Sequence, residues 1–110
     1  MKLPNGDSAV VDIAKLRDYC LSPDHLRGRH KARVFARALG LTPDDADTLR
    51  DALLAVAREE EAVLADRDEY GQRYVVDFTM KTAAGEAAVR STWIVRTDED
   101  FPRLTSCYVL

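Results

Sequence analysis

Cysteine is scarce in this chain, since Cys20 and Cys107 are the only two in 110 residues. Their spacing matches no metal-binding motif, and two thiols are too few for a disulfide framework, so we expect both to be reduced and buried. Long apolar runs are missing, and the first six residues lack the apolar segment of a signal peptide. The sequence therefore predicts a cytoplasmic protein that does not associate with a membrane.

Histidine is equally scarce, with His25 and His30 as the only two. No pattern of Cys or acidic ligands accompanies them, which argues against a zinc site. The chain also has no glycine-rich phosphate loop and no nucleophile elbow. We therefore predict neither a metal ion nor a cofactor.

The composition is that of an ordinary folded protein. A hydrophobic content of 46% argues against disorder, and 110 residues predict one domain over residues 1–110. With 16 basic against 19 acidic residues, the net charge is -3. This balance argues against coating of nucleic acid by the whole surface, but it is compatible with a local phosphate site.

The hydrophobic periodicity changes from helical to extended about halfway along the chain. Three helices are expected first, over residues 12–20, 29–39 and 42–61, with Val34, Phe35, Ala38 and Leu39 as the apolar stripe of the second. Strands are expected over residues 9–11, 62–64, 73–80, 87–96 and 104–110. The predicted fold class is α+β, with N-terminal helices packed on one face of a C-terminal antiparallel sheet of three to four strands. The other sheet face is left available.

The segment Arg27–Arg37 is the main charge anomaly. It contains five Lys or Arg residues and His30, with no acid among them, in an otherwise acidic chain. On a helix, Arg29, Arg33 and Arg37 fall on one ridge with His30 beside them. Two interpretations remain open. The cations are a solvated face that pairs with acids of the third helix, or they form a site for phosphate or RNA.

The two histidines flank Gly28, which permits close approach of the backbone to a ligand. An imidazole can take the proton of a ribose 2′-hydroxyl while a second acid protonates the leaving 5′-oxygen. Neighbouring Arg or Lys residues can neutralise the pentavalent phosphate. These residue types therefore suit metal-independent RNA cleavage, although a histidine in this setting is more often structural.

Polar residues of the sheet form a second candidate region. Arg90 and Thr92 are two residues apart and share a strand face, as Arg103 and Thr105 do in the last strand. These four residues either belong to the solvent-exposed face of the sheet or form part of the floor of a cleft. Whether the two rows adjoin depends on the strand register.

The turn Asp68–Tyr74 is a third candidate. It is either a polar turn that enters a strand or a place where Tyr70 or Gln72 contacts a base. Tyr74 and Trp93 are expected in the core.

Several stretches of the chain resemble an uncharacterised bacterial domain family. They include Leu16–Leu21, Pro23, His25, Gly28, His30–Phe35, Leu39-Gly40, Asp68, Tyr70-Gly71, Tyr74, Thr92–Ile94 and Pro102–Leu104. Members of that family look like small stand-alone proteins or C-terminal modules of bacterial polymorphic toxins. The arrangement is similar to the barnase–EndoU–colicin–RelE group of RNase toxins, which generally cleave RNA without a metal.

This resemblance implies a metal-independent RNase of toxin type. The implied catalytic residues are His25, His30, Lys31, Arg90 and Thr92. The resemblance also implies phosphate binding by Arg33, and the charge pattern itself adds Arg27, Arg29 and Arg103 as candidate phosphate or RNA-binding residues. The expected partner is RNA or another phosphate-bearing ligand. The alternative is a non-catalytic interaction module whose basic helix binds an acidic cognate protein or an anionic ligand.

Overall fold

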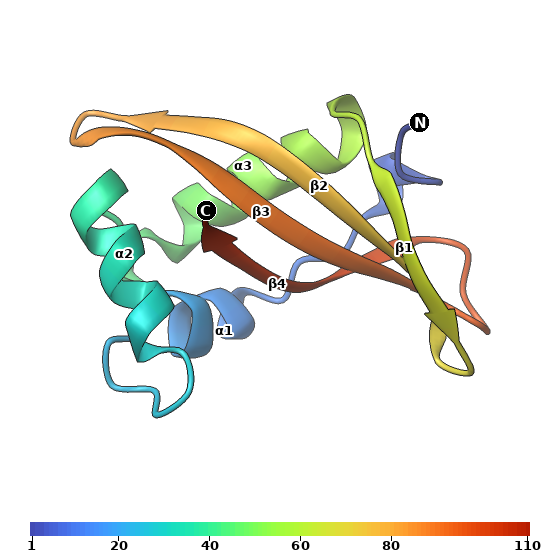
Figure 1. Cartoon of the computed structure of the whole chain (residues 1–110), viewed down its shortest axis with the longest axis horizontal. Helices are drawn as coiled ribbons and strands as arrows, with labels where there is room; N and C mark the ends of the chain where they lie inside the picture. Colours follow the sequence, from blue (N-terminus) through green and yellow to red (C-terminus); the bar gives the residue numbers. More distant parts are fainter.

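The computed structural model describes residues 1–110 and has an α+β fold, as the sequence predicts (Figure 1). The helices are α1 (Ile13–Lys15), continued by a π-helical turn (Leu16–Cys20), α2 (Arg29–Leu39) and α3 (Ala46–Glu59). The strands are β1 (Val63–Asp68), β2 (Gly71–Thr82), β3 (Gly85–Arg96) and β4 (Pro102–Val109). They form one antiparallel sheet in the order β1-β2-β3-β4. In Figure 1, α3 lies behind the sheet, α1 lies below β4, and α2 stands at the left, next to the arrowhead of β4.

Helix α2 has the predicted bounds. Gly40 ends it with a φ of 66°, a left-handed conformation that glycine adopts without strain. The prediction that Val34 belongs to the buried stripe is wrong, because Val34 is 36% exposed and Ala32 takes its place in the core. The buried positions Ala32, Phe35 and Leu39 follow a three- and four-residue spacing, so the helix is rotated slightly from the expected orientation.

Helix α3 begins at a capping box formed by Thr42 and Asp45, with Pro43 in the first turn. One 3-10 turn over Pro43–Asp45 leads into the α-helix. Its predicted apolar stripe is confirmed, since the buried residues are Ala46, Leu49, Leu53, Val56 and Ala57.

Strands β2 and β3 alternate as the sequence predicts. One face contributes large core side chains, among them Val76, Val89 and the fully buried Trp93. The opposite face carries polar residues, including Asp77 and Arg90, which are direct partners between β2 and β3. Because the helices cover only the first face, the second remains accessible (Figure 1).

The predicted strand over residues 9–11 is reduced to a single bridge. Val10 pairs with Arg103 in parallel orientation on the outer side of β4, through hydrogen bonds with Pro102 and Leu104. This bridge covers only the beginning of the β4 edge.

Both cysteines are free and buried, as expected. The Cys20 and Cys107 thiols are neighbours in the core, and the interaction with Cys20 together with burial raises the pKa of Cys107. The pair connects the π-helical turn to β4. No helix of the protein is long and apolar enough to cross a membrane.

Candidate functional site

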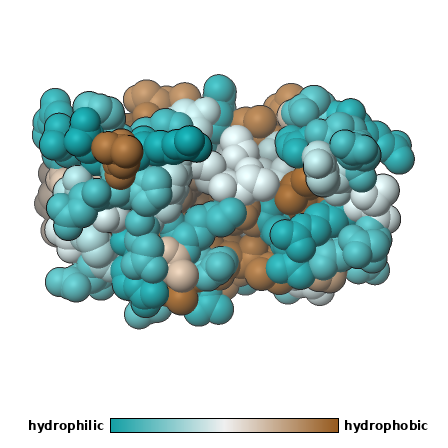
Figure 2. All heavy atoms as spheres, turned by 90° about the horizontal axis from the view of Figure 1, so that it is seen from below, coloured by the Kyte–Doolittle hydropathy of each residue, from teal (hydrophilic) through white to brown (hydrophobic).

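The exposed side of α2 is strongly cationic. Arg29, Arg33 and Arg37 are exposed there, with His30 beside them and Arg27 in the preceding turn. We call these five residues the α2 cationic face. Seen from below Figure 1, hydrophilic residues cover the part of the molecule where α2 lies (Figure 2).

No residue of the α2 cationic face makes an ion pair. The first interpretation of this segment required pairing with acids of the third helix, and no such pair forms between α2 and α3. The positive charge is therefore open to an external anion.

The sheet arginines have a different environment. Arg90 Nε and Nη2 donate to the two carboxylate oxygens of Asp77 at 2.8 and 2.9 Å. These bonds lower the pKa of Asp77 and raise the pKa of Arg90. Arg103 makes the same two-bond contact with Glu99, at 2.8 Å for both bonds. A phosphate that binds Arg90 or Arg103 must therefore share the guanidinium with the carboxylate of Asp77 or Glu99.

Helix α2 and the uncovered sheet face meet at Tyr108. Lys31 Nζ lies 4.4 Å from the centroid of the Tyr108 ring, a cation–π contact. Tyr108 is the direct cross-strand partner of Arg90. We call Lys31, Tyr108 and Arg90 the junction cluster. It brings two predicted site residues together around a tyrosine that the sequence reasoning missed.

The two polar rows of β3 and β4 adjoin at their threonines. Thr92 Oγ1 lies 2.6 Å from Thr105 Oγ1, and Thr92 also donates to the Ser106 carbonyl at 3.3 Å. The register between β3 and β4 shifts by one residue at this point. Thr92 pairs with Ser106, but the next residue, Trp93, pairs with Leu104, so Thr105 has no partner on β3. This bulge at Thr105 places Tyr108 beside Arg90.

His25 has a structural task in the turn before α2. Its Nδ1 accepts hydrogen bonds from the backbone amides of Arg27 and Gly28, at 3.1 and 3.0 Å. Its ring packs edge-on against Tyr19, with centroids 4.5 Å apart. Nδ1 is therefore an acceptor, which leaves the ring proton on Nε2.

Replacement of His25 by alanine should lower the free energy of unfolding by about 1 kcal/mol, the usual cost of losing a capping side chain. The variant His25→Asn should retain most of this stability, because its Oδ1 can accept the same two amides. His30→Ala is the matched control, since His30 is exposed and should change stability by less than about 0.5 kcal/mol. Urea denaturation measures all three. Equal losses for His25→Ala and His30→Ala would contradict the assignment.

The structure does not gather His25, His30 and Arg90 in one hollow. The three hollows on its surface are lined by other residues, although one of them includes Arg103. No three His, Cys, Asp or Glu side chains lie close enough to share a metal ion. His30 is on the same helix as Lys31, whereas His25 is held in the turn.

A model of the family described as "Domain of unknown function (DUF6883)" matches residues 2–110. The chain belongs to this family. The resemblance to an uncharacterised family is thereby confirmed, and the DUF6883 domain spans the helices and the sheet together. A search of the curated proteins finds no match.

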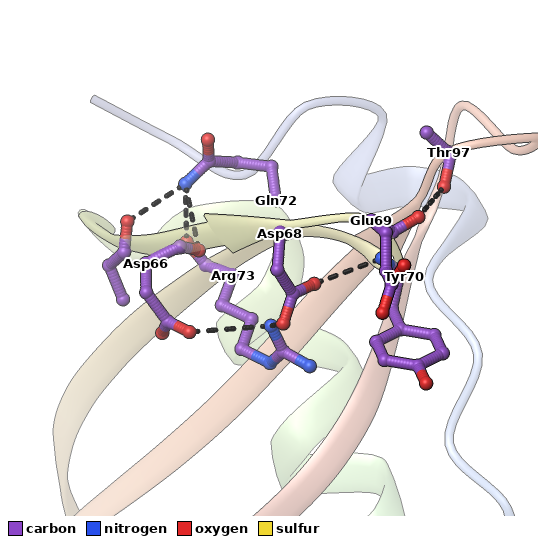
Figure 3. A network of polar contacts seen from close by, with 8 residues as sticks. Asp66, Asp68, Glu69, Tyr70, Gln72, Arg73 and Thr97 are labelled. Carbon is purple, nitrogen blue, oxygen red and sulfur yellow. Dashed lines mark hydrogen bonds and ion pairs between the residues drawn. The ribbon is translucent and has the colours of Figure 1, made fainter.

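In this DUF6883 domain the turn between β1 and β2 carries a polar network (Figure 3). Gln72 Nε2 donates to the Ala65 carbonyl at 3.0 Å, next to the irregular pairing of β1. Arg73 pairs with Asp66 and Asp68, and its hydrogen bond lowers the pKa of Asp68. Gln72 and Arg73 thus stabilise the hairpin.

Proposed function

We propose that this protein is a metal-independent ribonuclease that binds RNA on the α2 cationic face and cleaves it at the junction cluster. The observation that carries the proposal is the contact of Lys31 with Tyr108, directly across from Arg90. This contact joins an unpaired cationic helix to the polar sheet face. An RNA substrate is consistent with action in a cytoplasm.

The chemistry follows from the charges at the cluster. The ribose 2′-oxygen attacks the adjacent phosphorus, the bond from phosphorus to the 5′-oxygen breaks, and a 2′,3′-cyclic phosphate forms. A base removes the 2′-hydroxyl proton and an acid protonates the leaving 5′-oxygen. The ammonium of Lys31 and the guanidinium of Arg90 stabilise the pentavalent phosphate, which needs no metal.

The proton-transfer roles fall to His30 and Tyr108. His30 is exposed on α2 next to Lys31, and an imidazole can accept or donate a proton. Tyr108 carries a hydroxyl beside Arg90. His25 contributes less to this step, because its Nδ1 is occupied by two amides. Thr92 supports the scissile group from the next position on its strand face.

The resemblance to RNase toxins described above also supports the proposal. RNase toxins of the barnase–EndoU–colicin–RelE group also combine helices with a following antiparallel sheet. In those enzymes, basic and hydroxyl side chains of the sheet and of a preceding helix serve cleavage. The junction cluster has this composition.

Cleavage of mixed cellular RNA in EDTA tests the proposal. Lys31→Ala should reduce the cleavage rate by about 100-fold, a typical loss for one group that stabilises the transition state. His30→Ala should reduce it by a similar factor. Lys2→Ala is the control, because Lys2 is an exposed lysine beside β1 and should leave the rate unchanged. Absence of cleavage by the wild type with transfer, ribosomal and messenger RNA would refute the proposal.

A non-catalytic interaction module is the second candidate. The unpaired charge of the α2 cationic face favours it, because this surface is exposed and lines no hollow. Such a module would bind an acidic protein or another anionic ligand. Binding without cleavage, lost when the α2 arginines are replaced, would favour this second function.

A further inference from the structure

A groove lies beside β4, on the side where α1 packs. Its lining consists of Asp12, Ala14, Lys15, Tyr19 and Thr105, and its volume is about 410 Å³. We call it the β4-edge groove. Figure 2 views the molecule from this side and shows paler and hydrophobic residues between two hydrophilic regions. The volume falls within the range of small-molecule sites.

A second, smaller hollow extends the β4-edge groove. It has a volume of about 130 Å³ and shares Asp12, Lys15 and Thr105 with the first. It adds the cations Arg96 and Arg103. Arg96 makes no ion pair, so this extension contributes free positive charge.

The groove combines an aromatic ring with a cation and an acceptor. Tyr19 is half-buried and lines the groove. Lys15 Nζ donates to the Thr105 carbonyl at 3.3 Å and keeps further N–H donors for a ligand. One carboxylate oxygen of Asp12 caps α1 by accepting from the Ala14 amide, and the other is free to accept. A planar base with an attached phosphate matches this set.

The groove is continuous with both parts of the proposed site. Tyr19 packs against His25, and Gly28 lies so close that an added Cβ would be 2.6 Å from the Tyr19 carbonyl oxygen. The groove therefore begins where α2 begins. At its other side, Thr105 hydrogen-bonds Thr92, which shares its strand face with Arg90.

We propose that the β4-edge groove binds one nucleotide of single-stranded RNA. Its base stacks on Tyr19 and its phosphate contacts Lys15, with the extension around Arg96 left for the next phosphate. Aromatic rings commonly bind single-stranded bases in this way, together with nearby cations. The identity of the substrate as RNA rests on the function proposed above, whereas the groove and its chemistry do not.

Titration of the ¹⁵N-labelled full chain in EDTA tests the inference without any cleavage assay. With 5′-AMP and 5′-UMP we expect saturable amide shifts at Lys15, Tyr19 and Thr105. Inorganic phosphate at equal concentration should produce no saturable shift there. Tyr19→Ala should weaken nucleotide binding by about 10-fold, within the usual contribution of one stacked base.

Matched variants separate stacking from folding. Tyr19→Phe keeps the ring and should retain nucleotide affinity. Tyr70→Ala removes an exposed tyrosine from the β1–β2 turn and should also have no effect. If Tyr19→Ala loses the dispersed spectrum of a folded protein, Lys15→Ala replaces it and should weaken binding of nucleotide.

The possible outcomes distinguish the nucleotide groove from the ribonuclease proposal. Shifts confined to α2, or equal shifts with phosphate alone, would overturn the nucleotide groove. RNA cleavage without nucleotide binding in the groove would overturn it while leaving the ribonuclease proposal intact. Nucleotide binding in the groove without any RNA cleavage would support it and reject the ribonuclease.

Discussion

The triple variant Arg29→Glu, Arg33→Glu, Arg37→Glu is expected to weaken RNA binding by on the order of 100-fold or more at low salt. These arginines lie on one exposed ridge of α2 and have no carboxylate partner. Each arginine that contacts a phosphate releases a counterion. The slope of log affinity against log salt should therefore fall in magnitude by about 2 to 3 in the variant. Fluorescence anisotropy with a single-stranded oligoribonucleotide at several salt concentrations measures both quantities.

The control is a second triple variant with the same change in net charge. Arg50→Glu, Arg58→Glu and Arg67→Glu alter exposed arginines of α3 and β1, which are also unpaired. This variant should retain most of the affinity, because local geometry and not total charge creates the site. Equal losses in the two variants would show that binding depends only on net charge.

Trp93→Ala is expected to lower the free energy of unfolding by about 4 kcal/mol, the typical cost of removing a buried tryptophan side chain. Trp93 is fully buried in the sheet face that packs against the helices. Its Nε1 donates to Ser91 Oγ at 2.9 Å, and Ser91 Oγ donates to the Val76 carbonyl at 2.8 Å. The substitution thus leaves a cavity and a buried hydroxyl with one partner fewer. Since small domains have about 5 to 15 kcal/mol in total, much of the stability should be lost.

Urea denaturation followed by circular dichroism measures this effect. Trp93→Phe keeps most of the ring volume and should lose only about 1 to 2 kcal/mol, chiefly through the missing hydrogen bond. Tyr70→Ala, at a residue that is 65% exposed, should change stability by less than about 0.5 kcal/mol. A small effect of Trp93→Ala would mean that the sheet does not depend on this side chain.

Local signals were sufficient to predict α2 and α3, whereas half of the first predicted helix is a π-helical turn. Gly40 marks the end of α2, and Thr42 with Pro43 marks the start of the next helical segment. These signals act within one turn of the chain, so they can be read without knowing the tertiary structure. The rotation of α2 could not be read in this way, because Val34 and Ala32 compete for the core and packing against the sheet decides between them.

The candidate site was only partly predictable, because it depends on strand register. The sequence identifies Lys31, Arg90 and Thr92, but the pairing of Arg90 with Asp77 is visible only once β2 and β3 are aligned. Tyr108 was missed because strict alternation along β4 does not anticipate the bulge at Thr105. A bulge shifts every later side chain to the other face, and polarity alone gives no sign of it.

The contact between Lys31 and Tyr108 spans most of the chain in sequence. The thiol pair Cys20 and Cys107 bridges a similar distance, from the first helical segments to β4. Contacts between segments this far apart in sequence cost loop-closure entropy before they are gained. The junction cluster needs both the helices and the sheet, because Lys31 lies in α2 whereas Arg90 and Tyr108 lie in β3 and β4. Assembly of the junction cluster is therefore the same event as global folding, and a partially folded chain lacks the cluster on which the proposed activity depends.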